Sequence, residues 1–200
     1  MTSVPTIDLS AAQEAQFDFS SMDLACREHG FFLLKNHGID QEILDMWRLS
    51  KQFFDLSSGE KRLILRDKEN PLGYYDRELT KQKRDLKEVF DFMLPKDGVD
   101  RMNQWPEGNG EFREVMLAFF NAANDVAEST LRLVYRALGG EGINKFDLPM
   151  GSIYTSNARL NCYPTSDPLD ETEGKDVVSL GDMALHHHTD PGVLTLLLQD

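Results

Sequence analysis

The sequence has few cysteines and few basic residues, and each shortage excludes a class of protein. Only 2 of its 200 residues are cysteines, and the wide separation of Cys26 and Cys162 excludes a disulfide framework and a zinc knuckle. The 21 basic side chains are outnumbered by 34 acidic ones, which gives a formal net charge of -13. Such a charge repels phosphate backbones and anionic lipids, so we expect no nucleic acid partner and no membrane partner.

Several further features are missing. No apolar run is long enough to cross a bilayer, and the opening MTSVPTIDLS has no basic segment followed by an apolar one, so a cytoplasmic location is expected. The glycine-containing pieces EGNGE and GGEG do not lie between a strand and a helix, which excludes a phosphate-binding loop. A nucleophile-elbow serine motif is also missing. Nucleotide chemistry and acyl transfer are therefore not expected.

The sequence does contain enough apolar residues, 40%, for a globular core, and its patterns predict mixed helices and strands. Strands are predicted at VPTIDL, at FFLLK as a short buried strand, in the second half of LTKQKRDLKEVFDFML and at ARLNCYP, while NPLGYYDRE is predicted to be a loop. Four helices are predicted. The first ends at Gly30, and the second is capped by Asp40 and has Ile43, Leu44, Trp47 and Phe54 on one side. The third begins with a capping box of Ser57 and Glu60, and the fourth and longest extends from Glu111 to Leu138.

The strongest chemical signal lies near the end of the sequence, at His188-x-Asp190. Side chains two apart in a strand share a face, so this imidazole and this carboxylate could occupy adjacent positions around one metal ion. Two histidines and one carboxylate with open positions are the ligand set of non-haem iron(II) oxygenases. His186 shares the parity of His188 but lies one strand repeat away, roughly 7 Å, which is too far for the same metal.

Several motifs, in order, resemble those of the iron(II)/2-oxoglutarate-dependent dioxygenases, in particular the isopenicillin-N-synthase-like group. They are VPTIDLS, CREHGFFLLKNHGI, FFDLSSGEK, GYY, KEVFDFM, NQWP, RLNCYP and HTDPGVLTLLLQD, and they extend over nearly the whole sequence. The resemblance implies a double-stranded β-helix, a cupin-like jelly roll within a mainly β, α+β fold. It also implies that residues 1–150 form a helix-rich region packed on the barrel, that 151–200 begin the barrel, and that both form one structural unit.

The resemblance also implies the chemistry. His188 and Asp190 would be catalytic iron(II) ligands, and Asn161 and Tyr163 would bind the co-substrate 2-oxoglutarate. Arg159 has the same strand parity, and either a place in that pocket or a salt bridge within the sheet would explain it. With O2, and with ascorbate as a stimulant, such an enzyme hydroxylates or desaturates a small molecule and releases succinate and CO2.

Two parts of the family's site lie beyond residue 200: a second histidine ligand and an Arg-x-Ser pair that holds the far carboxylate of 2-oxoglutarate. We therefore expect a truncated sequence with an incomplete barrel, and residues 1–200 alone are expected to be inactive. Two alternatives stay open, an iron-dependent oxidase that does not use 2-oxoglutarate, and a catalytically inactive fragment or protein-binding module. The sequence does not specify the substrate or the oligomeric state.

Overall fold

The computed structural model describes residues 3–11, 17, 19–80, 82–100, 102–139, 152–169, 177–181 and 192–199. The chain divides into two compact units. Unit 1 consists of Met1–Gln41, Asn121–Gly151 and Gly192–Asp200, and unit 2 of Glu42–Phe120 and Ser152–Pro191. Each unit contains residues from both sides of position 150. The division expected at that position, between a helix-rich region and the start of the barrel, stays a prediction.

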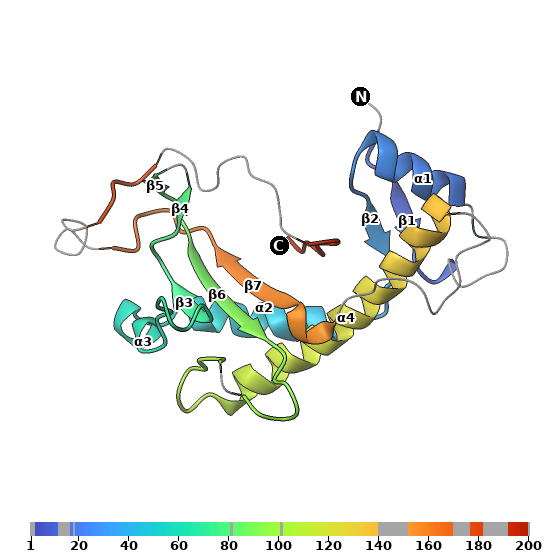
Figure 1. Ribbon diagram of the computed structural model, residues 1–200. Helices are drawn as coiled ribbons and strands as arrows, with labels where there is room; N and C mark the ends of the chain where they lie inside the picture. The colour runs from blue at the N-terminus through green and yellow to red at the C-terminus, as the bar shows by residue number, and fades with distance from the viewer. Residues whose placement is uncertain are drawn as a thin grey trace. The chain divides into compact units, whose positions relative to one another are not determined.

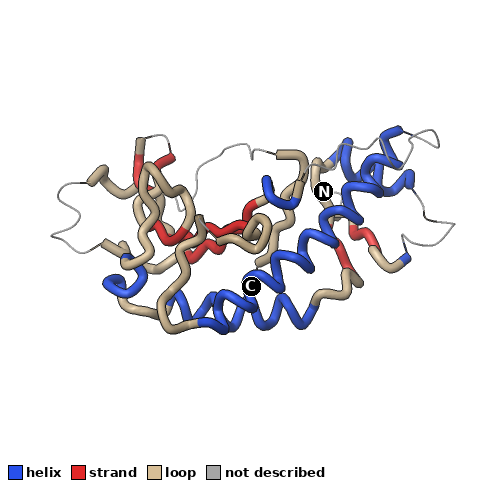
Figure 2. The backbone as a smooth tube through the Cα atoms, turned by 60° about the horizontal axis from the view of Figure 1, so that its bottom comes forward, coloured by secondary structure: helices blue, strands red, loops and turns tan. Residues whose placement is uncertain are grey.

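Unit 1 is built around two short parallel strands. β1 (Thr6–Asp8) pairs with β2 (Leu33–Lys35), and α1 (Phe19–Glu28) lies between them in sequence. Figure 2 shows this strand pair in red beside helical segments in blue. The core of the unit consists of Ile7, Leu9, Met22, Val126 and Leu133. The strand at FFLLK was predicted correctly, but its predicted burial is wrong, because Leu33 is 57% exposed.

Two helices lie at the start of unit 2, and the first begins two residues earlier, within unit 1. α2 (Asp40–Phe54) buries Met46, Leu49, Ser50 and Phe53. Of the four residues expected on one side, three are half-buried and Leu44 is 63% exposed. α3 (Ser58–Arg62) begins with the predicted capping box: the Ser57 hydroxyl accepts from the Glu60 amide, and the Glu60 carboxylate accepts from the Ser57 amide. This start to α3 is therefore confirmed.

The central element of unit 2 is an antiparallel sheet in the order β3, β6, β7 (Figure 1). β3 spans Gly73–Tyr75, β6 spans Glu88–Met93 and β7 spans Asn157–Cys162. The strands at KEVFDFM and ARLNCYP are confirmed, whereas the loop predicted at NPLGYYDRE is wrong, because it contains β3. The short hairpin of β4 (Leu79–Thr80) and β5 (Lys83–Arg84) connects β3 to β6.

Gly73 explains why β3 has an unusual sequence. Its φ is +110°, and an added Cβ would lie 2.5 Å from the Ile64 carbonyl oxygen. The backbone here lies close to the segment after α3, since the Tyr74 amide donates to Ile64 (2.9 Å). A glycine is therefore required at a position where sequence patterns suggest a loop.

The longest helix is α4 (Gly110–Gly139), as predicted. It begins where the Asn109 side chain accepts from the Phe112 amide at 3.0 Å. Its predicted apolar stripe is confirmed by the burial of Phe112, Met116, Phe119, Val126, Thr130 and Leu133. Residues 110–120 belong to unit 2, and residues 121–139 belong to unit 1.

Residues 193–198 are the apolar run VLTLLL, and they form no strand with the described part of the chain. The segment has no assigned strand, and Val193 and Leu197 are 73% and 75% exposed. No described residue supplies a neighbouring strand for it, and an apolar sequence forms a stable strand only when its backbone groups are paired. Among the described helices, none is long and apolar enough to span a membrane.

Candidate active site on the polar face of the sheet

β7 presents two chemically different faces. Leu160 is 7% exposed and pairs across the sheet with buried Phe90, whereas Arg159 and Asn161 are exposed on the opposite side. Tyr163, which follows the strand, is also exposed, at 52%. The structure thus brings the strand residues Arg159 and Asn161 onto one polar face, with Tyr163 just beyond it. Their binding roles stay predictions.

The neighbouring strand β6 supplies the residues that lie beside Arg159 and Asn161 on this face. Val89 is the register partner of Asn161, and Asp91 is the register partner of Arg159. The guanidinium of Arg159 donates to both oxygens of Asp91, from Nε at 2.7 Å and from Nη2 at 2.9 Å, and Nη1 donates to Glu78 at 3.0 Å. The salt-bridged arrangement of Arg159, one of the two left open by the sequence, is therefore present.

The surroundings of Glu78 and Arg159 favour the ionised form of each side chain. Burial raises the pKa of Glu78, but the hydrogen bond from Lys87 and the positive charges of Arg159 and Lys87 outweigh it, so this pKa lies below its ordinary value. Burial lowers the pKa of Arg159, and hydrogen bonding to Asp91 more than compensates, so this pKa is raised. The polar face consequently carries fixed charges of both signs at neutral pH.

The predicted metal ligands His188 and Asp190 lie outside the described residues. Within the described ranges, no group of three histidine, cysteine, aspartate or glutamate side chains is placed to hold a metal ion. The last described segment before them is anchored on β5, where the Arg84 amide donates to Ser179 (3.1 Å) and the Gly181 amide donates to Arg84 (2.8 Å). The chain thus enters the predicted metal-binding stretch from the β4–β5 hairpin.

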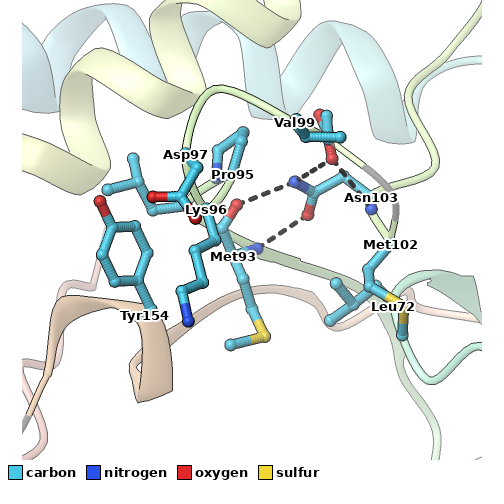
Figure 3. A pocket seen from close by; sticks show the side chains of 11 residues that line it. Leu72, Met93, Pro95, Lys96, Asp97, Val99, Met102, Asn103 and Tyr154 are labelled. Atoms are coloured by element: carbon cyan, nitrogen blue, oxygen red, sulfur yellow. Dashed lines mark hydrogen bonds between the residues drawn. The ribbon is translucent and has the colours of Figure 1, made fainter.

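A pocket of about 400 Å³ opens at the other end of the β6–β7 pair (Figure 3). Asn103 forms one wall, and its side chain bonds both the amide and the carbonyl of Met93, each at 2.9 Å. Lys96 and Tyr154 also line the pocket. The described lining residues do not include Asn161 or Tyr163, so this hollow is separate from the predicted co-substrate face.

Sequence reasoning missed three charged residues of the polar face: Arg66, Glu78 and Asp91. Asp91 carried a usable signal, because it is a carboxylate within the strand EVFDFM, whose other residues are largely buried. A buried charge of this kind requires a partner of opposite sign. Arg66 and Glu78 lie in irregular segments and carried no comparable signal.

A second charged group lies at the edge of the apolar face and was also missed. Lys61 Nζ is 2.6 Å from Glu88 Oε1, and the Tyr74 hydroxyl donates to the same oxygen. Burial raises the pKa of Tyr74, and the hydrogen bond to Glu88 adds to the shift. The hydroxyl therefore stays protonated and acts as a donor.

In sequence order, α2 and α3 precede the sheet whose strand β7 carries Arg159 and Asn161 on its open face. The family model described as the non-haem dioxygenase in morphine synthesis N-terminal domain matches residues 4–108, more than half of the chain. The chain therefore belongs to the non-haem dioxygenase family, within the iron(II)/2-oxoglutarate superfamily that the sequence motifs indicated.

Curated relatives with similar sequences are also named as hydroxylases or dioxygenases. The chain is 30% identical over 224 residues to homoarginine-6-hydroxylase of Glycine max, covering 100% of this chain and 66% of that protein. It is 30% identical over 206 residues to 2'-deoxymugineic-acid 2'-dioxygenase of Hordeum vulgare, covering 99% of this chain and 56% of that protein. The chain thus spans about half to two thirds of the length of these relatives.

Solved structures show the same fold at lower identity. A full-length Neurospora crassa protein crystallised with alpha-KG and 5-formyluracil matches with a TM-score of 0.65 and 22% identity, over 80% of this chain and 52% of that one. The rice dioxygenase for auxin oxidation matches with a TM-score of 0.55 and 22% identity, over 80% and 52%. The predicted fold class, a jelly roll of which this chain covers only a part, is confirmed by these matches.

Proposed function

We propose that this chain is the N-terminal part of an iron(II)- and 2-oxoglutarate-dependent oxygenase that hydroxylates or desaturates a small molecule and releases succinate and CO2. The observation that carries the proposal is the open face of β7, where Arg159 and Asn161 lie exposed, followed by exposed Tyr163. A strand with one apolar face in the core and one polar face left open is suited to line the interior of a barrel that binds a ligand.

His188 and Asp190 are proposed to hold iron(II), because an imidazole and a carboxylate two residues apart supply two of the three donors of the facial iron site. Bound iron would supply the activation of O2, coupled to oxidative decarboxylation of 2-oxoglutarate. Tyr163 is proposed to donate its hydroxyl hydrogen bond to a 2-oxoglutarate carboxylate, and Asn161 to contact the same co-substrate. These residues would orient the co-substrate at the metal.

The substrate is proposed to be a small molecule. Relatives at about 30% identity are named for action on homoarginine and on 2'-deoxymugineic acid, both small molecules. The formal charge of -13 also argues against a nucleic acid substrate.

The test is succinate formation from 2-oxoglutarate in the full-length protein, meaning this chain together with the rest of its barrel, supplied with iron(II), ascorbate and O2. We expect Asp190→Ala to abolish iron-dependent turnover, because loss of one anionic donor weakens the site. Asp55→Ala, which removes an exposed carboxylate of similar size, serves as the matched control and should retain turnover. Full activity of Asp190→Ala would contradict the assignment, and oxidation without 2-oxoglutarate would favour the related oxidases.

A further inference from the structure

Four charged side chains form a closed ring on the polar face of the sheet. Arg66 donates to Asp91 (2.7 Å) and to Glu78 (2.6 Å), and Arg159 donates to the same two carboxylates. Each acid thus bridges both arginines, and each arginine bridges both acids. We call this set, Arg66, Glu78, Asp91 and Arg159, the charged ring.

The charged ring connects four separate segments of unit 2. Arg66 follows α3, Glu78 follows β3, Asp91 lies in β6 and Arg159 lies in β7. The acids are its more buried members, with side chains 5% exposed for Asp91 and 14% for Glu78, while Arg159 is 35% exposed. Lys87 adds a further cation at 2.7 Å from Glu78. Because every member of the ring bonds two others, the ring holds its members in fixed geometry.

The charged ring helps to fix the register of β7 against β6. Among the described strands β7 pairs only with β6, so one ladder sets its register. A slip of one residue would turn Asn161 to the opposite face of the sheet. The bidentate bond between Arg159 and Asp91 joins register partners two residues before Asn161, and the rest of the ring ties that bond to the loops around β3.

Arg159 has little capacity left for a ligand. A guanidinium carries five N–H donors in a fixed fork, and three of those of Arg159 serve ring carboxylates. Turning the side chain toward a ligand would leave Asp91 in contact with one cation where it now has two. Removing a partner from a buried carboxylate carries a large desolvation cost.

We propose that Arg159, through the charged ring, is a positioning residue that holds the Asn161 and Tyr163 end of β7 in place for 2-oxoglutarate, and that it does not itself bind the co-substrate. This inference rests on the proposed function of the same face. It assigns Arg66, Glu78 and Asp91 to the support of the site, although the sequence motifs gave none of the three a role there.

The experiment compares Arg159→Gln, Asp91→Asn and the double variant in the full-length protein. Both single variants break the same bond, so each should raise the KM for 2-oxoglutarate by about five-fold, which is about 1 kcal/mol at 1.4 kcal/mol per tenfold. The double variant should have a KM for 2-oxoglutarate no higher than that of the more impaired single variant, because the effects of two residues that share one bond are not additive. If Arg159 were a direct ligand, Arg159→Gln alone would raise the KM and Asp91→Asn would leave it unchanged, which would overturn the proposal.

A second readout separates positioning from general destabilisation. Backbone hydrogen exchange of residues 157–163 should become faster in both single variants. Arg62→Gln is the matched control, because it removes another arginine bonded to a buried carboxylate through Nε and Nη2, that of Asp76 (2.9 Å). This control should leave both β7 exchange and the KM at wild-type values. The milder variants Arg159→Lys and Glu78→Gln give intermediate changes and keep the test valid if the others do not fold.

The outcomes also separate this inference from the proposed function. Wild-type protein that neither binds nor consumes 2-oxoglutarate would refute the proposed function, and with it the co-substrate part of the inference, even if exchange at β7 responds as expected. Wild-type turnover of 2-oxoglutarate with unchanged exchange and unchanged KM in the ring variants would refute the positioning role alone.

Discussion

The two faces of the β3–β6–β7 sheet show how one short sheet can provide both stability and a ligand surface. On one face Tyr74, Phe90 and Leu160 are register neighbours and are buried. On the other face Asp91 pairs with Arg159, and the buried Val89 pairs with the exposed Asn161. The apolar face depends on burial and aromatic packing, whereas the polar face depends on directed bonds between charges, so substitutions on the two faces should have different consequences.

The largest effect is expected from Phe90→Ala on the apolar face. Phe90 is fully buried, and its ring centroid lies 5.0 Å from that of Phe53 and 5.4 Å from that of Phe112. The cavity should lower the free energy of unfolding by about 3–5 kcal/mol. Denaturant unfolding of the full-length protein measures this change, and Asn161→Ala on the exposed polar face is the comparison. Equal losses for the two variants would break the distinction between the faces.

Lys61→Met tests the buried pair at the edge of the apolar face. Lys61 and Glu88 are both 5% exposed, so removal of the cation leaves a carboxylate buried beside Tyr74. Breaking such a pair typically costs about 3–5 kcal/mol, whereas replacing both partners with apolar residues is often close to neutral. The double variant Lys61→Met with Glu88→Leu should therefore recover most of the loss. A double variant as unstable as Lys61→Met would show that the pair itself contributes the stability.

The polar face should contribute a smaller, pH-dependent effect. The pKa of Glu78 is lowered from its ordinary value of 4.5, despite the opposing effect of burial, by the bonds from Lys87 and its neighbours. A carboxyl whose pKa is lower in the folded state contributes stability above its unfolded pKa and loses it as the pH falls through the folded value. The free energy of unfolding should thus decrease as the pH is lowered below about 4.5, and this decrease should be shallower in Glu78→Gln. Identical slopes for the two proteins would contradict this assignment.

Local features of the fold were predictable because their determinants are close in sequence. The Ser57 and Glu60 capping box and the apolar stripe of α4 are patterns that repeat within one or two helical turns. The most buried residues of α2 were not predicted, and they include Ser50, whose hydroxyl lies 3.4 Å from Met46 Sδ. A polar residue in the buried stripe hid the stripe from a hydrophobic pattern.

The polar face was only partly predictable. Strand alternation was sufficient to place Arg159 and Asn161 on one side of the strand. The charged ring was not predictable, because its bonds join residues as far apart in sequence as Glu78 and Arg159, 81 positions, and depend on which loops fold beside the sheet. β3 was missed for a similar reason, since Gly73 is explained only by the backbone of Ile64 beside it.

Two tyrosines allow the same chemical change to be made on either side of the comparison. Tyr163, which follows β7 on its polar face, is 52% exposed, whereas Tyr74 is fully buried on the apolar face, where its hydroxyl donates to Glu88.

The most direct measurement is the dissociation constant of 2-oxoglutarate for two iron(II)-loaded, full-length variants, Tyr163→Phe and Tyr74→Phe. Loss of a charge-assisted hydrogen bond of roughly 1.5–3 kcal/mol predicts binding about tenfold weaker or more for Tyr163→Phe, with unchanged iron affinity and unchanged thermal stability. Tyr74→Phe should lower thermal stability and leave the dissociation constant at its wild-type value, and unchanged 2-oxoglutarate binding by Tyr163→Phe would contradict the account.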